Sequence, residues 1–239
     1  MSGSYRAAAL LRTGTPGDVD APPGTEQVPI TVIEPSRTAR GGIIVLHESR
    51  DFTDVLTEFM NSLAAEGWIV VAPDLFYRSR GTGPVFGAEL FADVAGCFDW
   101  LRGRGVFGDC IGLLGFDTAG TAAVLAATDS PIGAVVSVAP RGIATPVAPD
   151  AEALAAVAPR LRAPWLALFG ADDPDTPAAE VEELREAAAH ASVATLLVTY
   201  PGLHHRPDRP AFDILGPDDD VTAVDAQTRI FEWFDSHLR

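Results

Sequence analysis

The sequence predicts a single α/β domain over residues 1–239, in which a mostly parallel central sheet carries helices on both faces. Three observations lead to this prediction. Apolar runs of strand length alternate with segments of helical spacing along the chain. A length of 239 residues suits one such domain with an ample core. Finally, the apolar run at 111–116 passes through a sharp turn of small residues into an Ala-rich helical pattern, and we expect the rest of the chain to be organised around this junction.

The junction reads Ile-Gly-Leu-Leu-Gly-Phe-Asp-Thr-Ala-Gly from position 111 to position 120. A buried strand, a sharp turn and a helix in this order form the nucleophile elbow of the α/β-hydrolase fold. Gly115, Ala119 and Gly120 allow the strand and the helix to approach closely without Cβ clashes. Asp117 stands at the centre, where serine or cysteine would be expected, so it is the candidate nucleophile.

The elements before the elbow follow from periodicity and from the residues that end each segment. Weak strands are expected near residues 5–12 and 28–34. The stretch 14–27 between them is rich in Gly, Pro and acidic residues and predicts a turn or mobile loop. Continuous apolar runs predict strands buried on both faces at 42–47 and 68–72.

Helical spacing of large apolar residues predicts one helix from Asp54 to Ala65, which ends before Gly67, and another from about Ala88 to Arg102. Beyond the elbow, strands are expected at 132–138, 164–169 and 194–200, and helices at 180–190 and 223–238. Only about two dozen residues separate the strands at 132–138 and 164–169, which leaves no room for a cap domain.

Composition and charge exclude several classes of function. The net charge of −16 and the pI near 4.5 argue against binding to nucleic acid or to an anionic membrane. The sequence has no secretory signal pattern and no apolar run that approaches the ~18 residues of a membrane span. Cys97 and Cys110 lack metal-ligand spacing and are expected to be structural thiols in a reducing compartment. We therefore expect a soluble cytoplasmic protein, monomeric or homodimeric, that acts on a small-molecule substrate without a cofactor or a metal.

Three loops at strand ends carry the candidate chemistry in the order nucleophile, acid, histidine, which is the order of this fold. Asp173 follows the strand at 164–169 in an acidic turn, where a carboxylate can hold a histidine in the correct tautomer. His205 follows the last strand, where a general base belongs. Its neighbour His204 leaves an ambiguity of one residue.

From about Gly41 onward the sequence resembles the dienelactone hydrolase family, small α/β-hydrolases without a cap whose nucleophile is normally cysteine. The segments that carry the resemblance are Leu-His-Glu at 46–48, Pro-Asp-Leu-Phe-Tyr-Arg at 73–78, Gly-Phe-Asp-Thr-Ala-Gly at 115–120, Gly-x-x-Asp-x-x-x-Pro at 170–177 and Tyr-Pro-Gly-x-x-His at 200–205. The last spacing favours His205 over His204 as the partner of Asp173. The chain departs from the family at Asp117, which replaces cysteine, and at Ala119, which replaces glycine.

The resemblance implies roles for further residues. Glu48 matches a glutamate that neighbours the family's thiol, whereas beside Asp117 it would form a like-charge pair and raise one carboxyl pKa. Arg78 and Arg209 match two arginines that bind a substrate carboxylate, a task for which guanidinium groups are suited. We expect both to face the same pocket as Asp117. For each arginine taken singly, an ion pair with a nearby acid is an equal alternative.

Backbone N–H groups of Ser49 and Thr118, which follow Glu48 and Asp117, are expected to form the oxyanion hole. With Asp117 at the elbow, the sequence leaves three functions open. The first is hydrolysis of a small lactone or ester that bears a carboxylate, through an Asp-His-Asp triad. The second is hydrolysis of an epoxide or haloacid through an alkyl-enzyme ester. The third is lyase, isomerase or cyclase chemistry, or a pseudoenzyme that binds a small carboxylate.

Overall fold

A computed structural model describes residues 3–12, 23–48, 52–78, 86–130, 132–207 and 217–238. Eight strands form one sheet in the order β1-β2-β4-β3-β5-β6-β7-β8. The strands are β1 (Gly3–Arg12), β2 (Pro23–Glu34), β3 (Gly41–Leu46), β4 (Trp68–Pro73), β5 (Ile111–Phe116), β6 (Ala134–Val138), β7 (Trp165–Gly170) and β8 (Thr195–Tyr200). β1 pairs antiparallel with β2 and β2 antiparallel with β4, whereas all other neighbours are parallel. The predicted mostly parallel sheet is confirmed.

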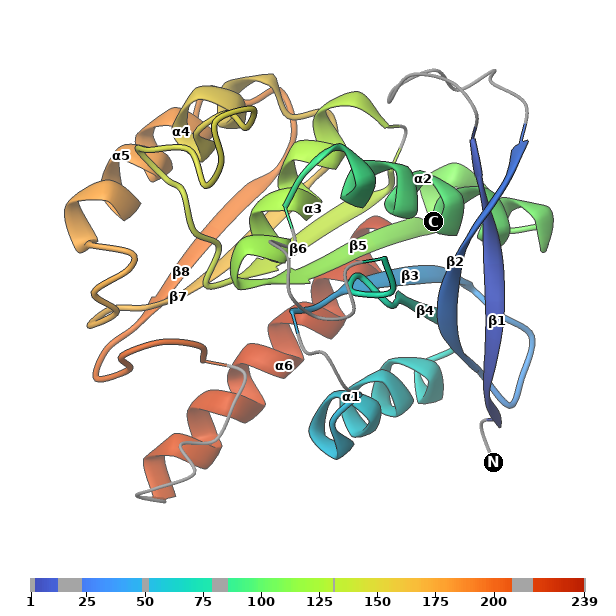
Figure 1. Ribbon diagram of the computed structural model, residues 1–239. Helices are drawn as coiled ribbons and strands as arrows, with labels where there is room; N and C mark the ends of the chain where they lie inside the picture. Colours follow the sequence, from blue (N-terminus) through green and yellow to red (C-terminus); the bar gives the residue numbers. More distant parts are fainter. Residues whose placement is uncertain are drawn as a thin grey trace.

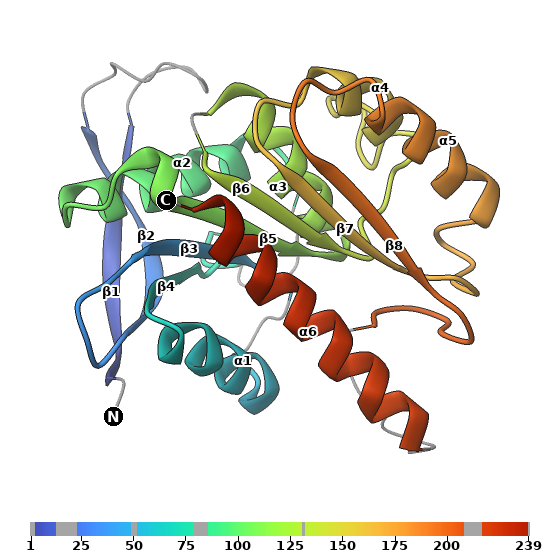
Figure 2. The same ribbon diagram turned by 180° about the vertical axis from the view of Figure 1, so that it is seen from behind.

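Helices cover both faces of the sheet (Figure 1). The helices are α1 (Asp54–Ala65), α2 (Ala88–Gly103), α3 (Asp117–Asp129), α4 (Leu154–Val157), α5 (Ala178–Ala188) and α6 (Pro217–His237), with short 3₁₀ turns η1 (Gly108–Cys110) and η2 (Ala158–Arg160). The view from behind in Figure 2 shows α1 and α6 on one face, and α2 to α5 lie on the other. Each face buries its own apolar core, the larger one beneath α2, α3 and α5.

The local sequence explains how the helices begin and end. α1 begins after Thr53, whose Oγ1 accepts a hydrogen bond from the Leu56 N–H at 3.3 Å. It ends before Gly67, which adopts a φ of 107° that favours glycine. α3 is buried along nearly its whole length, and six of its alanines and glycines allow it to lie close against β5 and β6.

The structure corrects two details of the sequence prediction. Residues 23–27 belong to β2, which pairs with β1 as far as Pro23, so the predicted loop at 14–27 is shorter at its end. The remainder of that loop, residues 14–22, lies outside the described residues. The helix expected at 223–238 begins earlier, at Pro217.

The connection from β6 to β7 confirms the expected absence of a cap for this part of the chain. Residues 139–164 hold the short α4 and η2 and no separate domain. In the described part of the chain, no helix is long and apolar enough to cross a membrane. Because β5, β6, β7 and β8 are parallel neighbours, their carboxyl ends lie along one edge of the sheet, where functional loops of this architecture gather.

Candidate active site

Asp117 occupies the turn between β5 and α3 in a backbone conformation that residues other than glycine rarely adopt. Its φ is 55°, a left-handed value that stores strain. The turn is tight enough to require glycine beside it: a Cβ at Gly115 would lie 2.4 Å from the carbonyl oxygen of Ala119. The elbow expected from the sequence is therefore present, and it presents a partly exposed carboxylate at the edge of the sheet.

Two other strand-end loops bring His205 and Asp173 to this carboxylate. His205 Nε2 lies 2.7 Å from Asp117 Oδ1. On the other side of the ring, His205 Nδ1 donates to Asp173 Oδ2 at 2.8 Å. Asp173 is buried, and the Asp175 N–H donates to its second oxygen at 2.9 Å. The imidazole thus joins the two carboxylates in one line.

The ambiguity between the adjacent histidines is resolved by this arrangement. His204 Nδ1 lies 3.3 Å from the carbonyl oxygen of Asp172, and its side chain is exposed. His205 alone contacts both Asp117 and Asp173. The expected contact between His205 and Asp173 is confirmed.

Arg206 is a charged neighbour of Asp117 that the sequence reasoning missed. Its Nη1 atom lies 3.6 Å from Asp117 Oδ2, and its guanidinium carbon lies 4.0 Å from the ring centroid of Phe116. The side chain is largely buried, at 9% exposure. Its position next to the histidine was the available signal, because a residue adjacent to a candidate base in a strand-end loop enters the same site. Asp117 therefore has a cation on one oxygen and an imidazole on the other.

The pKa directions follow from these contacts. Burial by itself would raise the pKa of Asp117, but the contact with His205 and the charges of Arg206, His205 and Arg141 outweigh burial and lower it. The Asp117 contact raises the pKa of His205, burial opposes this, and the Asp173 contact raises it further. Both shifts favour the charged form of His205 next to an ionised Asp117.

Glu48 caps the helix that begins at Asp117. The Ala119 N–H, in the first turn of α3, donates to Glu48 Oε1 at 3.1 Å. A carboxylate at this position is favoured by the partial positive charge at the N-terminus of the helix. The sequence predicts that a like-charge pair with Glu48 raises one carboxyl pKa. The pKa of Asp117 is instead lowered, because the hydrogen bond with His205 and the nearby positive charges outweigh burial.

The two backbone groups expected to form the oxyanion hole are only partly placed. Thr118 is the second residue of α3 and directly follows Asp117, so its N–H belongs to the first turn, whose N–H groups have no partner within the helix. Ser49 lies outside the described residues. Both roles stay predictions.

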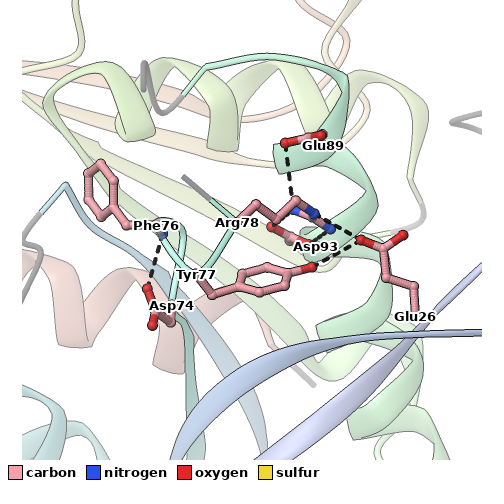
Figure 3. Close-up of polar contacts among 7 residues, drawn as sticks. All are labelled: Glu26, Asp74, Phe76, Tyr77, Arg78, Glu89 and Asp93. Atoms are coloured by element: carbon pink, nitrogen blue, oxygen red, sulfur yellow. Dashed lines mark hydrogen bonds and ion pairs between the residues drawn. The ribbon is translucent and has the colours of Figure 1, made fainter. Parts of the chain in front are cut away.

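Arg78 is held by carboxylates (Figure 3). Its Nη1 and Nη2 atoms each donate to Asp93 at 2.9 Å, and its Nε atom donates to Glu26 at 2.9 Å. Glu89 lies 3.9 Å from Nη1. Among the described residues, no contact joins Arg78 to Asp117, His205 or Asp173. The ion-pair alternative that the sequence left open is therefore the observed arrangement, and the other predicted arginine, Arg209, lies outside the described residues.

Comparison with known proteins places this geometry in a family. The pattern of the Dienelactone hydrolase family matches residues 29–238, which is most of the chain. This chain belongs to the dienelactone hydrolase family.

Individual relatives agree with this membership. A Salmonella typhimurium protein named "Putative carboxymethylenebutenolidase" is 24% identical over 210 residues, which cover 80% of this chain and 76% of that protein. The crystal structure of a Klebsiella pneumoniae protein named "Putative Dienelactone Hydrolase" has a TM-score of 0.76 at 21% identity, covering 98% of this chain and all of that chain. Dienelactone hydrolase from Anabaena variabilis has a TM-score of 0.69 at 20% identity, covering 100% of this chain and 99% of that chain. These structures confirm the α/β-hydrolase fold.

The contact between Asp117 and His205 predicts a measurable effect of Asp117 on the His205 pKa. Asp117→Asn removes the largest cause that raises the His205 pKa, so this pKa is expected to fall. Imidazole NMR titration of both proteins checks the direction without any substrate. Asp129→Asn, at the far end of α3, makes the same change in net charge and should leave the His205 titration in place. A His205 titration unchanged by Asp117→Asn would contradict the contact.

The same shift has a consequence for stability. Because the pKa of His205 is raised above its ordinary value of 6.5, its charged form stabilises the fold fully below about pH 6.5. This contribution is lost as the pH rises through the raised pKa. The pKa of Asp117 is lowered from 3.8, so its contribution is present above that value and is lost as the pH falls through the lowered pKa.

Proposed function

We propose that this protein is a hydrolase of small esters or lactones that carry a carboxylate, and that Asp117, His205 and Asp173 form its catalytic triad. The observation that supports this most directly is the line from Asp117 through the His205 ring to Asp173, with distances of 2.7 Å and 2.8 Å. The line lies at the edge of the sheet formed by the carboxyl ends of the strands, where functional loops of this architecture gather. Membership of the dienelactone hydrolase family supports the choice of substrate class.

The protonation states favour Asp117 as nucleophile over Asp117 as base. A carboxylate whose pKa is lowered is a weak proton acceptor, so it is poorly matched to general-base catalysis near neutral pH. The same carboxylate is ionised and needs no base to activate it for attack. His205 is therefore not required as a base in the first step.

In that first step, His205 acts as the acid. One oxygen of Asp117 attacks the carbonyl carbon of the ester or lactone, and the bond from this carbon to the alkoxide oxygen breaks. The charged imidazole, whose pKa is raised, gives its proton to the departing alkoxide. The acyl group is then joined to Asp117 as an anhydride, and His205 is neutral.

The second step follows because the covalent bond removes a charge. Once Asp117 is acylated, it no longer carries the negative charge that is the main cause of the raised His205 pKa. The ring can then stay neutral and accept a proton from a water molecule, while Asp173 holds it through Nδ1. Attack of this water on the anhydride releases the acid product and restores the Asp117 carboxylate and the charged His205.

A second candidate, hydrolysis of an epoxide, is favoured by the identity of the nucleophile. Attack of Asp117 on a saturated carbon gives an ordinary ester, which is more stable than an anhydride, and the charged His205 can protonate the epoxide oxygen as the ring opens. A haloacid would use the same nucleophile but would leave the acidic His205 without a task in the first step. The geometry therefore favours substrates whose leaving atom is oxygen.

The route can be tested by single turnover in ¹⁸O-labelled water with enzyme in excess, after a panel of lactones, esters, epoxides and haloacids has identified a substrate. If an alkyl-enzyme ester forms, the product alcohol is unlabelled and Asp117 carries the label, because water attacks the carbonyl carbon of the ester. With an ester or lactone, label in Asp117 after one turnover requires that the anhydride has formed. If Asp117 only activates water, the label enters the product at once and Asp117 stays unlabelled. Mass spectrometry of the peptide that contains Asp117 reads the outcome.

Two sets of results would contradict the proposed hydrolase activity. In the first, wild type binds small carboxylates but turns over no member of the panel, and His205→Ala binds them equally well. This result would indicate a non-catalytic binding protein. Turnover without water as a reactant would instead indicate lyase, isomerase or cyclase chemistry.

A further inference from the structure

Arg141 lies at the carboxyl end of β6, beside the strand that ends at the nucleophile. β5 and β6 pair in register so that Phe116 lies opposite Val138, and Asp117 directly follows Phe116. Thr121, one turn into α3, donates from its hydroxyl to the Arg141 carbonyl at 2.5 Å. The backbone of Arg141 is therefore held against the first turn of the nucleophile helix.

The side chain of Arg141 extends toward the triad. Its Nη2 atom lies 2.9 Å from Asp175 Oδ2, and the Asp175 N–H donates to the triad acid Asp173 at 2.9 Å. The Arg141 charge is also one of the causes that lower the pKa of Asp117. The guanidinium thus lies beside the loop that carries Asp173, near enough for its charge to act on Asp117.

An anionic substrate needs such a cation. Asp117 must be ionised to attack, and the protein carries a net charge of −16, so a carboxylate that approaches the site is repelled unless a positive group compensates. Arg206 already lies against Asp117 and is largely buried. Arg141 is 41% exposed and is accessible to a ligand.

Arg141 pairs with Asp175 and Arg78 pairs with Asp93, and the free-energy cost of replacing these carboxylates by a ligand differs greatly between the two pairs. Asp175 is 51% exposed, and an ion pair between exposed groups contributes little to stability because water solvates both partners when they separate. Asp93 is 2% exposed, so taking Arg78 from it would leave a buried carboxylate without its partner, which is strongly unfavourable. A substrate carboxylate can therefore replace Asp175 on Arg141 much more readily than it can replace Asp93 on Arg78.

Arg141 also has an unused donor. Within the described ranges, its Nε atom is buried and has no hydrogen-bond partner. A small rotation of the guanidinium toward a ligand would let two parallel N–H groups meet one carboxylate, the geometry for which arginine is suited. Exchange of Asp175 for a ligand can thus increase the number of hydrogen bonds that this side chain makes.

We propose that Arg141 binds the carboxylate of the substrate in exchange for Asp175, and that Arg78 does not. This inference rests on the proposed function, because it takes the bound carboxylate to be part of the molecule that the triad hydrolyses. Arg206 remains with Asp117 throughout. The site therefore takes substrates with a carboxylate placed between the nucleophile and the loop that carries Asp173.

Binding of succinate, measured by NMR from the amide signals of Thr121 and Gly142, tests this without turnover. Arg141→Gln is expected to weaken succinate binding about tenfold or more, the effect of losing one charged bidentate contact. Arg141→Lys should keep part of the affinity, because a point charge remains. The uncharged analogue succinamide should bind weakly to every variant. A thermal unfolding curve shows that each variant is folded.

Asp175→Asn is expected to change succinate affinity in the opposite direction from Arg141→Gln. It removes the competitor for Arg141 while keeping the backbone N–H that donates to Asp173, so succinate is expected to bind several-fold more tightly. Arg160→Gln is the matched control, because Arg160 forms a similarly exposed ion pair with Glu152 away from the triad and should not affect binding.

Three outcomes would overturn the inference: wild type that does not bind succinate, equal binding by Arg141→Gln, or a loss that follows Arg78→Lys or Arg209→Gln instead. Its failure is distinguishable from failure of the proposed function. Hydrolysis of anionic esters that does not depend on Arg141 leaves the hydrolase standing and removes this site. Succinate binding through Arg141 in a protein that hydrolyses nothing leaves the site standing and removes the hydrolase.

Discussion

Asp117→Asn is expected to lower kcat on any hydrolysed substrate by about 10⁴-fold or more, the size of effect seen when one member of a catalytic triad is removed. The amide keeps the shape of the side chain but has no charge and does not attack a carbonyl or an epoxide. KM should change much less, because the arginines and the rest of the pocket remain. Steady-state kinetics with Asp129→Asn as the control separates loss of the Asp117 carboxylate itself from loss of one negative charge on α3.

The companion variant Asp117→Cys gives a second test of the same position. It restores the residue that the family normally has at the elbow, next to the same His205 and Asp173. If the wild type hydrolyses no member of the panel while Asp117→Cys hydrolyses dienelactone-like esters, the scaffold is intact and the natural aspartate has changed its chemistry. Full activity in Asp117→Asn would remove Asp117 from the mechanism.

Arg78→Met is expected to lower the free energy of unfolding at pH 7 to 8 by about 3 kcal/mol, because it leaves the buried Asp93 without its bidentate partner. Burial raises the pKa of Asp93 to about 6 even though Arg78 opposes the shift. Urea denaturation followed by circular dichroism measures the loss. Asp93→Leu combined with Arg78→Met should recover much of it, since the pair is then replaced by apolar groups.

The pH dependence of this loss identifies its cause. A carboxyl group whose folded pKa lies above its ordinary value of 3.8 binds protons more tightly in the folded state, so it stabilises the fold at low pH and this contribution is lost as the pH rises through about 6. Without Arg78 the pKa of Asp93 rises further. The difference between Arg78→Met and wild type should therefore shrink as the pH is lowered from 8 toward 5. A difference that is independent of pH would mean that lost packing of the Arg78 stem, not the buried charge, causes it.

Activity separates the structural role of Arg78 from the role expected from the family resemblance. Under conditions where Arg78→Met is folded, its KM for an anionic substrate should stay close to that of wild type, because Arg78 is held by Asp93 and Glu26. A large increase in KM with unchanged stability would restore Arg78 as the carboxylate-binding residue.

Much of the fold could be predicted from the sequence because its signals are local. The helix at Asp54–Ala65 has the predicted bounds, since Thr53 and Gly67 mark its ends and large apolar residues repeat at helical spacing between them. The elbow at Asp117 could be located because only a tight strand-to-helix turn needs small residues at Gly115 and Gly120. Local signals were weaker near β2, where the residues from Pro23 to Gln27 have turn-forming composition but pair with β1.

The sequence by itself determined the order of the elements, the turn that presents Asp117, and the spacing that places His205 opposite Asp173. Only the tertiary structure decided which partner each charged side chain takes. Arg78 lies with Asp93, Arg206 with Asp117, Arg141 with Asp175, and Glu48 at the start of α3. The physical reason is that backbone conformation depends mainly on neighbours along the chain. The ion-pair partner of a long charged side chain depends instead on which carboxylates, often far apart in sequence, the fold brings within reach. Asp93 is buried and Asp175 is exposed, and neither property is encoded locally. Separation of Arg78 from Asp93 is therefore strongly unfavourable, whereas separation of Arg141 from Asp175 costs little.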